Sequence, residues 1–377
     1  MLRRLVLLSF LCGLLVFLIA QQPVSTQTPA SKQPPKPPQD LAETQDMSKF
    51  VVTLQQVTAP VLVFDGKRSY VNGLQPEQFQ LFDNNKEQNL TSVDLTYTPI
   101  SLVVAIQANT RADKILPQVN KIGAMLKPIV LGDQGEAAVI AFDHRVRLMQ
   151  PFTSDADDLT KAIKGITPGS SSSRLLDAVE QSTYLLSHRP KNRRRIILVI
   201  GEGRDYGSQA HSRETLEKVQ LANVVTYWVD MSHWLGLLTT PAPDPRPNNM
   251  PPAMQPMPGG VPATPTTVDQ AYGTNGGSAD FLPLLIEIFQ DATKIFKVPA
   301  ATLYTKGTGG EQFSFASQKG LESAISEISN QLHSQYLITY TPNNTGDGGF
   351  HHITVNVIGH PNYKCETKPG YFMSPKF

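Results

Sequence analysis

The chain has few cysteines. Only Cys12 and Cys365 occur in its 377 residues. Cys12 lies in an apolar N-terminal stretch that we expect to be removed on export, so no second thiol would then be left for an internal disulfide. Leu11 stands before Cys12 where a lipoprotein signal needs a small residue, which argues against lipidation. We interpret Cys365 as a buried strand residue and not as a reactive thiol.

The sequence also lacks an excess of either charge, because 33 Lys and Arg face 32 Asp and Glu for a formal net charge of +1. Nothing in this balance indicates a nucleic-acid partner or attraction to an anionic membrane. The one dense basic cluster, at 191–195, stands where a helix is expected to end and a strand to begin. Cations at that place complement the helix dipole.

Motifs of enzyme chemistry are absent as well. No Gly-x-Ser-x-Gly elbow surrounds Ser170–Ser173, and the pair His351 and His352 has no third metal ligand at a recognisable spacing. Gly201–Gly207 follows an apolar strand as a dinucleotide-binding turn would, but its glycine spacing is one residue too long and Glu202 would repel a pyrophosphate. We predict a non-enzymatic protein, with a nucleotide-dependent enzyme that uses Gly201–Gly207 as the alternative.

Residues 1–20 have the pattern of an export signal. Two arginines precede an apolar stretch from Leu5 to Ile19, which is short for a membrane span. Cleavage after Ala20 would release a periplasmic or secreted protein. Leu18 is a poor match to the small residue that cleavage favours, so an uncleaved membrane anchor is the alternative.

Residues 21–47 are rich in Pro, Gln, Thr and Lys, and we expect a disordered linker there. Short β-type runs separated by Asp-Gly and Asn-Gly turns follow at 48–98, in a module too small for a large core of its own. Residues 336–377 contain two more such runs, near 336–341 and 352–358. We predict that these strands pack with the N-terminal module, because joining them buries both apolar faces.

Apolar strands alternate with helical segments over 99–335, which is typical of an α/β fold with a doubly wound, mostly parallel sheet flanked by helices. A Pro/Gly-rich insertion at 235–280 interrupts the pattern, either as a surface excursion or as a polyproline segment presented to a partner. The expected strands are 101–106, 137–142, 146–149, 196–200, 224–229 and 312–315. The expected helices are 112–127, 155–164, 174–187, 211–222, 281–296 and 318–335.

The strand at 101–106 ends in polar residues, at the edge where parallel sheets bind ligands. Here the chain resembles the von Willebrand factor type A domain family, specifically its bacterial secreted branch. The β-rich lead-in, Thr308-Gly-Gly310 and Pro369-Gly-Tyr371 extend the resemblance over about residues 50–375. In that family, Asp-x-Ser-x-Ser, a later Thr and a third-strand Asp hold Mg²⁺ or Mn²⁺. The matching positions here are Gln107, Asn109, Arg111, Ser173 and Glu202.

The resemblance therefore implies a retained fold with a degenerate metal-ion-dependent adhesion site. Mg²⁺ prefers carboxylate ligands, whereas Gln107 and Asn109 offer neutral amides and Arg111 a fixed positive charge. We expect no bound Mg²⁺ or Mn²⁺, unless Asp205 folds back to supply a ligand. We predict instead that Arg111 pairs with Glu202 and that both amides donate to Glu202; the alternative is that Arg111 points to solvent.

These observations favour an exported, non-enzymatic interaction protein of adhesion or scaffold type. Its type A domain would bind a protein partner through the rim of the sheet, at the five positions named above. We expect no cofactor and no nucleic-acid partner, and contact with a membrane only through an uncleaved N-terminal segment.

Overall fold

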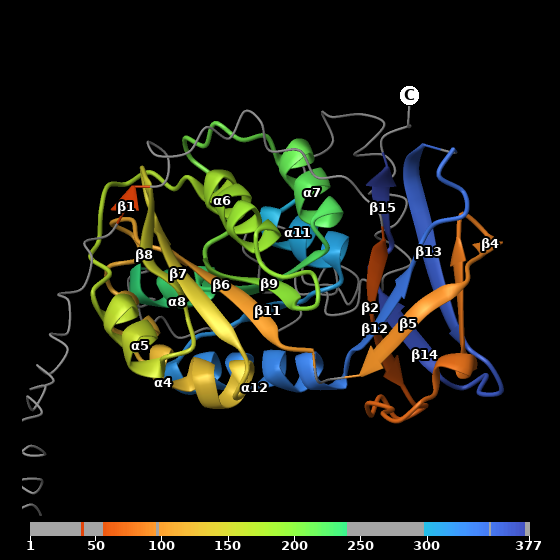
Figure 1. Ribbon diagram of the computed structural model, residues 1–377. Helices are drawn as coiled ribbons and strands as arrows, with labels where there is room; N and C mark the ends of the chain where they lie inside the picture. The colour runs from red at the N-terminus through yellow and green to blue at the C-terminus, as the bar shows by residue number, and fades with distance from the viewer. Residues whose placement is uncertain (1–38, 41–55, 96–97, 240–297, 347, 374–377) are drawn as a thin grey trace, which may run out of the picture. The chain divides into compact units, whose positions relative to one another are not determined.

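The computed structural model describes residues 39–40, 56–95, 98–239, 298–346 and 348–373, all of which lie in one compact unit (Figure 1). Several predicted segments lie outside the described residues. They are the export signal at 1–20, the linker at 21–47 except Gln39 and Asp40, most of the insertion at 235–280, and the helix at 281–296. Within the described ranges, no helix is long and apolar enough to cross a membrane.

The described part of the α/β domain is built on a sheet of seven strands in the order β1-β8-β7-β6-β9-β10-β11. Neighbours from β7 to β11 run parallel, and β8 and the two-residue β1 join one edge antiparallel. This confirms the predicted fold class. The strands are β1 (Gln39–Asp40), β6 (Ile100–Gln107), β7 (Glu136–Phe142), β8 (Val146–Thr153), β9 (Arg194–Gly201), β10 (Val224–Asp230) and β11 (Gln312–Ser314).

Helices cover both faces of this sheet, which is why its central strands are continuously apolar. All eight residues of β6 are buried, and Leu102 and Ile106 face one core while Val103 and Ala105 face the other. The helical segments are α3 (Leu116–Val119), α4 (Gly123–Met125), η3 (Leu126–Leu131), α5 (Ala156–Lys164), α6 (Leu175–Ser187), α7 (Ser212–Leu221), α8 (Ser232–Thr239), α11 (Ala300–Thr308) and α12 (Gln318–Ser334).

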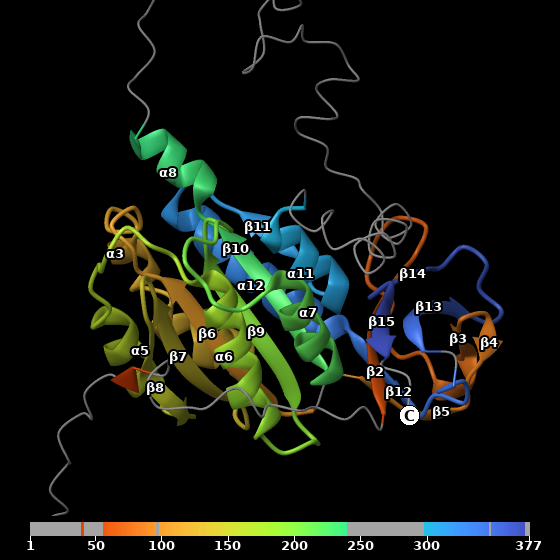
Figure 2. The same cartoon turned by 90° about the horizontal axis from the view of Figure 1, so that it is seen from above.

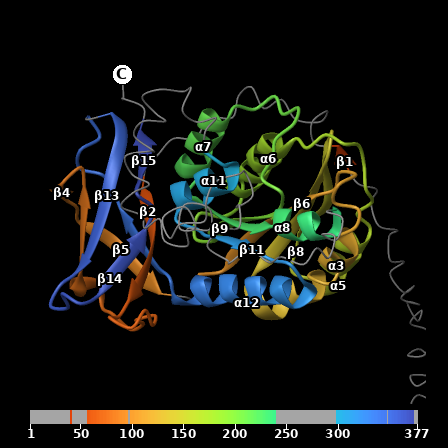
Figure 3. The ribbon, with the colours of Figure 1, turned by 180° about the vertical axis from the view of Figure 1, so that it is seen from behind.

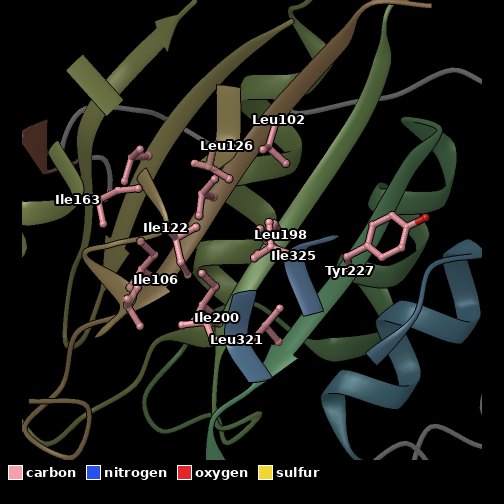
Figure 4. Packing of buried hydrophobic residues seen from close by; sticks show 14 of the residues in the cluster. Leu102, Ile106, Ile122, Leu126, Ile163, Leu198, Ile200, Tyr227, Leu321 and Ile325 are labelled. Atoms are coloured by element: carbon pink, nitrogen blue, oxygen red, sulfur yellow. The ribbon is translucent and has the colours of Figure 1, made fainter. Parts of the chain in front are cut away.

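The larger core lies under α5, α12 and the segment from α3 to η3, where Ile122, Leu126, Ile163 and Leu321 pack on β6 and β9 (Figure 4). The other core lies under α6, α7 and α11. Figure 3 shows α12 along one face of the sheet, with α6, α7 and α11 on the opposite face. Because helices pack on both faces of the sheet, the ends of its strands and the loops that follow them are held in fixed positions.

Two sequence predictions need correction here. The helix expected at 112–127 begins only at Leu116, with Pro117 in its first turn, and is divided into α3, α4 and η3. Gly123 also approaches α5 so closely that a Cβ there would lie 2.7 Å from the Cα of Thr160. The insertion expected from residue 235 begins later, because 235–239 belong to α8 and Leu235 is buried in the larger core.

The terminal strands form a β subdomain of two four-stranded sheets, β14-β2-β12-β5 and β15-β13-β3-β4. β2 pairs with β12 and β14, and β3 pairs with β13, so each sheet joins N-terminal strands to C-terminal ones, and the two sets of strands pack together as predicted. The elements are β2 (Val57–Phe64), η2 (Pro76–Gln78), β3 (Phe79–Asp83), β4 (Lys86–Glu87), β5 (Leu90–Leu95), β12 (Tyr336–Tyr340), β13 (Gly349–Val357), β14 (Lys364–Thr367) and β15 (Gly370–Met373).

Two amide side chains at the end of α7 join the subdomain to the α/β domain. Asn223 accepts the Thr58 N–H at 3.1 Å and donates to the Gln56 carbonyl at 3.1 Å. Gln220 accepts the Phe372 N–H at 3.2 Å and donates to the Gly370 carbonyl at 3.4 Å. Figure 2 shows α7 and β15 side by side at this junction.

Candidate functional site

The site lies at the carboxyl ends of β6, β7 and β9, which meet at one edge of the sheet. We call the loops at this edge the rim: 108–111, 143–145, 167–173 and 202–207. Backbone hydrogen bonds hold the loops together, since the Gly169 N–H donates to the Ala108 carbonyl at 2.7 Å and the Thr110 N–H to the Ser170 carbonyl at 3.0 Å. The rim is therefore a connected surface, and the five predicted positions all lie on or directly beside it.

Arg111 and Glu202 form an ion pair at the centre of the rim. The Nε of Arg111 lies 2.9 Å and 3.1 Å from the two carboxylate oxygens of Glu202. The side chain of Glu202 is 3% exposed, whereas that of Arg111 is 54% exposed. The predicted pair is thus confirmed. The buried carboxylate of Glu202 binds the Nε edge of the guanidinium, and the rest of the Arg111 side chain reaches the surface.

Gln107 and Asn109 do not donate to the Glu202 carboxylate, so that prediction is wrong. The Oε1 of Gln107 accepts the backbone N–H of Glu202 at 2.8 Å, and the Oδ1 of Asn109 accepts the N–H of Ala112 at 3.1 Å. Both amide oxygens satisfy buried backbone donors that would otherwise lack a partner. Gly201 permits this arrangement, since a Cβ there would lie 2.8 Å from the Gln107 Oε1.

Ser173 is buried and forms a backbone bridge with Tyr206. The Ser173 N–H donates to the Tyr206 carbonyl at 3.2 Å, and the Tyr206 N–H donates to the Ser173 carbonyl at 2.8 Å. The hydroxyl of Ser173 has no hydrogen-bond partner among the described residues. Tyr206 is 52% exposed. Tyr206 was not predicted from the sequence, because the bridge joins two loops 33 positions apart with no motif in either.

Asp205 does not supply a metal ligand at the rim. Its Oδ1 accepts the Leu176 N–H at 3.1 Å and the Ser208 hydroxyl at 2.5 Å, so it caps the first turn of α6. Asp143 is a second buried rim carboxylate. It accepts the Arg145 N–H at 2.8 Å and contacts Arg147 at 3.4 Å.

The residues at the five positions do not fit a Mg²⁺ or Mn²⁺ ion. The amide oxygens of Gln107 and Asn109 already accept backbone donors, and a cationic guanidinium is held against the carboxylate of Glu202. Across the described ranges, no group of three or more His, Cys, Asp and Glu side chains is arranged to hold a metal. The donor set is that of a protein-made ion pair.

The turn Gly201–Gly207 has the geometry expected of a permissive loop. Gly203 and Gly207 have φ of +75° and +99°, a region that favours glycine. The N–H groups of Glu202 and Tyr206 already donate within the protein, and α7 begins only at Ser212. The turn therefore does not present a helix N-terminus to a pyrophosphate.

Comparisons with known proteins agree with this fold. Residues 107–204 match the family model described as von Willebrand factor type A domain. No curated protein sequence matches the chain.

Three similar solved structures come from bacteria. An aerotolerance-related membrane protein from Bacteroides fragilis is 12% identical with a TM-score of 0.37, over 62% of this chain and 99% of that one. The protein BatB from Bacteroides thetaiotaomicron is 12% identical with a TM-score of 0.36, over 61% and 99%. The von Willebrand factor domain of a type V pilus tip protein from Porphyromonas gingivalis is 15% identical with a TM-score of 0.26, over 30% and 40%. Over residues 107–204, within the α/β domain, this chain is similar to the von Willebrand factor type A domain family.

Proposed function

We propose that this chain is an exported, non-enzymatic interaction protein whose rim binds a protein partner without a metal ion. The observation that carries the proposal is the Arg111–Glu202 pair, with Nε held at 2.9 Å and the side chain half exposed. Export is supported by the charged and apolar pattern of residues 1–20.

The guanidinium of Arg111 is well placed to bind a partner. Arginine carries five N–H donors, and only the one on Nε is used by Glu202. The terminal nitrogens make no hydrogen bond to any described residue. Because Glu202 fixes the orientation of the group, less side-chain entropy is lost when a partner's acceptor oxygens bind it. The pair therefore provides an oriented donor surface.

Tyr206 supplies a second anchor on the same surface. Its ring is about half exposed while its backbone is held by Ser173, so a large amphipathic side chain stands on a fixed loop. Tyr and Arg are, with Trp, the residue types enriched among binding hot spots. We propose that Arg111 and Tyr206 together form the centre of the interface.

The test is a comparative capture from envelope and secreted fractions of the source organism. The exported full chain serves as bait, as the unmodified protein, Arg111→Ala, Tyr206→Ala and Lys67→Ala. Lys67 is an exposed cation in the β subdomain and serves as the matched control. Each capture is repeated with Mg²⁺ and with a chelator, and the bound proteins are quantified by mass spectrometry.

We expect at least one partner that the unmodified chain and Lys67→Ala retain equally and that both rim variants lose. Each loss should correspond to about 1–3 kcal/mol, or roughly a tenfold to hundredfold weaker affinity. Retention should be the same with Mg²⁺ and with chelator. If every captured protein is retained by both rim variants, or is released by the chelator, the proposal is wrong.

A further inference from the structure

A cavity lies at the opposite edge of the sheet from the rim. Its volume is about 910 Å³, which is within the range of small-molecule sites. One wall is made by the amino ends of β9 and β10 and the end of α6. The other is the outer face of the sheet β14-β2-β12-β5, where Thr58, Leu337 and Thr339 alternate with residues that face the subdomain core.

The two walls are fixed to each other. Asn223 lines the cavity. Its amide oxygen accepts the N–H of Thr58 in β2, and its amide nitrogen donates to the carbonyl of Gln56, just before β2. Gln220, also in the lining, ties α7 to β15 through two further hydrogen bonds. The cavity is therefore preformed, and a ligand would not have to draw the domains together.

Positive charge dominates the lining. Asp94 is the one carboxylate among the described lining residues, against five lysines and arginines: Lys191, Arg193, Arg194, Arg195 and Lys368. Arg193 has an acidic partner in Glu136, whose carboxylate lies 3.2 Å from its Nε and also pairs with Arg189 at 2.6 Å. The other lining groups are mainly hydroxyls and amides.

Arg194 and Arg195 have no carboxylate partner in the described part of the chain. Arg194 donates to the carbonyl of Leu332 and to the amide oxygen of Gln335. Arg195 donates to carbonyls at the ends of α6 and α7, including that of Ala222 at 3.0 Å. These acceptors satisfy N–H groups but leave both formal charges uncompensated. Burial lowers the pKa of Arg194 to about 10, as expected for a cation without a counter-ion.

Lys368 is the clearest case of an uncompensated charge. It is 3% exposed and lines the cavity. Its ammonium lies 5.7 Å from the centre of the Tyr371 ring and makes no hydrogen bond or ion pair with any described residue. Burial lowers its pKa to about 7, against a smaller opposing effect of Asp83. A lysine buried in this way destabilises the fold unless a counter-ion compensates it.

We propose that this cavity binds a small polyanion, whose anionic groups neutralise Lys368 and the arginines at the start of β9. The hydroxyl and amide side chains of the lining would bind the uncharged part of the ligand. Charge-assisted hydrogen bonds to an anion are shorter and stronger than those between neutral groups. The site is separate from the rim, so it would add a small-molecule ligand to a protein-binding domain.

The test uses calorimetry of the full exported chain with three probes. Inositol hexasulfate keeps a constant charge with pH, citrate presents carboxylates, and myo-inositol is the uncharged control. Lys368→Met removes the charge and keeps the length of the stem. Leu337→Trp fills the cavity from β12 without a change of charge, and Lys67→Ala is a cation control outside the lining.

We expect at least one of the two polyanions to bind, myo-inositol not to bind, and Lys67→Ala to behave as the unmodified chain. Lys368→Met and Leu337→Trp should each weaken binding roughly tenfold or more, as expected for losing one charged hydrogen bond or the space for the ligand. Circular dichroism confirms that each variant is folded. Absence of binding by both polyanions, or unchanged affinity in either cavity variant, would overturn the proposal. Binding of citrate but not of inositol hexasulfate, weakened in both cavity variants, would support the proposal and identify the ligand class as a carboxylate.

Discussion

The guanidinium of Arg111 stands against the carboxylate of Glu202, with Nε 2.9 Å and 3.1 Å from its two oxygens, at the edge of the sheet where type A domains hold their metal. The positive charge at this place belongs to the protein. The central claim of our account is that this ion pair replaces a bound cation and presents a fixed donor group to a partner.

Loss of Arg111 should destabilise the fold. Arg111→Ala leaves the buried carboxylate of Glu202 without its partner, and we expect a loss of about 1 kcal/mol in the free energy of unfolding, since the arginine is half exposed. The double variant Arg111→Ala with Glu202→Gln should recover most of this loss. Urea unfolding measures both. Arg204→Ala, which removes an exposed arginine of the same loop, should change the stability by less than about 0.5 kcal/mol.

The buried Asp83 cluster should make the β subdomain sensitive to acid. Asp83 accepts hydrogen bonds from Tyr340 and Tyr371 at 2.8 Å and contacts the Nδ1 of His351 at 2.7 Å. Burial alone would raise the pKa of Asp83, but the hydrogen bonds from His351, Asn344 and the two tyrosines lower it below its ordinary value of 3.8. Its contribution to stability is therefore complete above pH 3.8 and is lost as the pH falls below that value.

Asp83→Asn should remove this contribution. Breaking a buried charged network costs about 3 kcal/mol or more, so we expect a loss of that size at pH 7 and a smaller difference from the unmodified chain at pH 3. Asp94→Asn, at an exposed aspartate of the same subdomain, is the matched control. An equal effect of the two substitutions at pH 7 would contradict this account of the cluster.

Lys368 should also make stability rise with pH, but in a higher range than Asp83. Its pKa is about 7 in the folded chain and 10.5 ordinarily, so between these values the unfolded chain binds more protons than the folded one. Stability contributed by this group therefore rises with pH from about 7 towards 10.5. Lys368→Met should be more stable than the unmodified chain at pH 6 and should lack this rise. Thermal unfolding of both proteins from pH 6 to 9 in dilute salt measures the difference.

The sequence was a good guide to the elements of the α/β domain. The apolar runs at 101–106 and 196–200 became β6 and β9 because strands buried on both faces need no polar alternation. The apolar spacing after β6 predicts one helix, whereas the structure has three short helical segments there. A periodic pattern shows which face is buried, but it does not show where a backbone is interrupted.

The candidate site was predictable only in part. The pairing of Arg111 with Glu202 followed from opposite charges at two positions of the resembled motif, in the loops that come after the neighbouring strands β6 and β9. The orientation of Gln107 did not, because it depends on a backbone N–H at Glu202 that needs an acceptor. The bridge between Ser173 and Tyr206 and the cavity near Lys368 join residues far apart in the chain, and single-sequence patterns carry no signal for such contacts.

The most direct test of the central claim is calorimetric titration of Mg²⁺ and Mn²⁺ into two proteins. One is the unmodified chain, and the other carries Gln107→Asp, Asn109→Ser and Arg111→Ser, which restores oxygen ligands and removes the guanidinium. We predict that the unmodified chain gives no heat of binding at the rim, and that the triple variant binds either ion and is stabilised by it against thermal unfolding. If the unmodified chain binds Mg²⁺ or Mn²⁺ as tightly as the triple variant, the ion pair does not replace the metal.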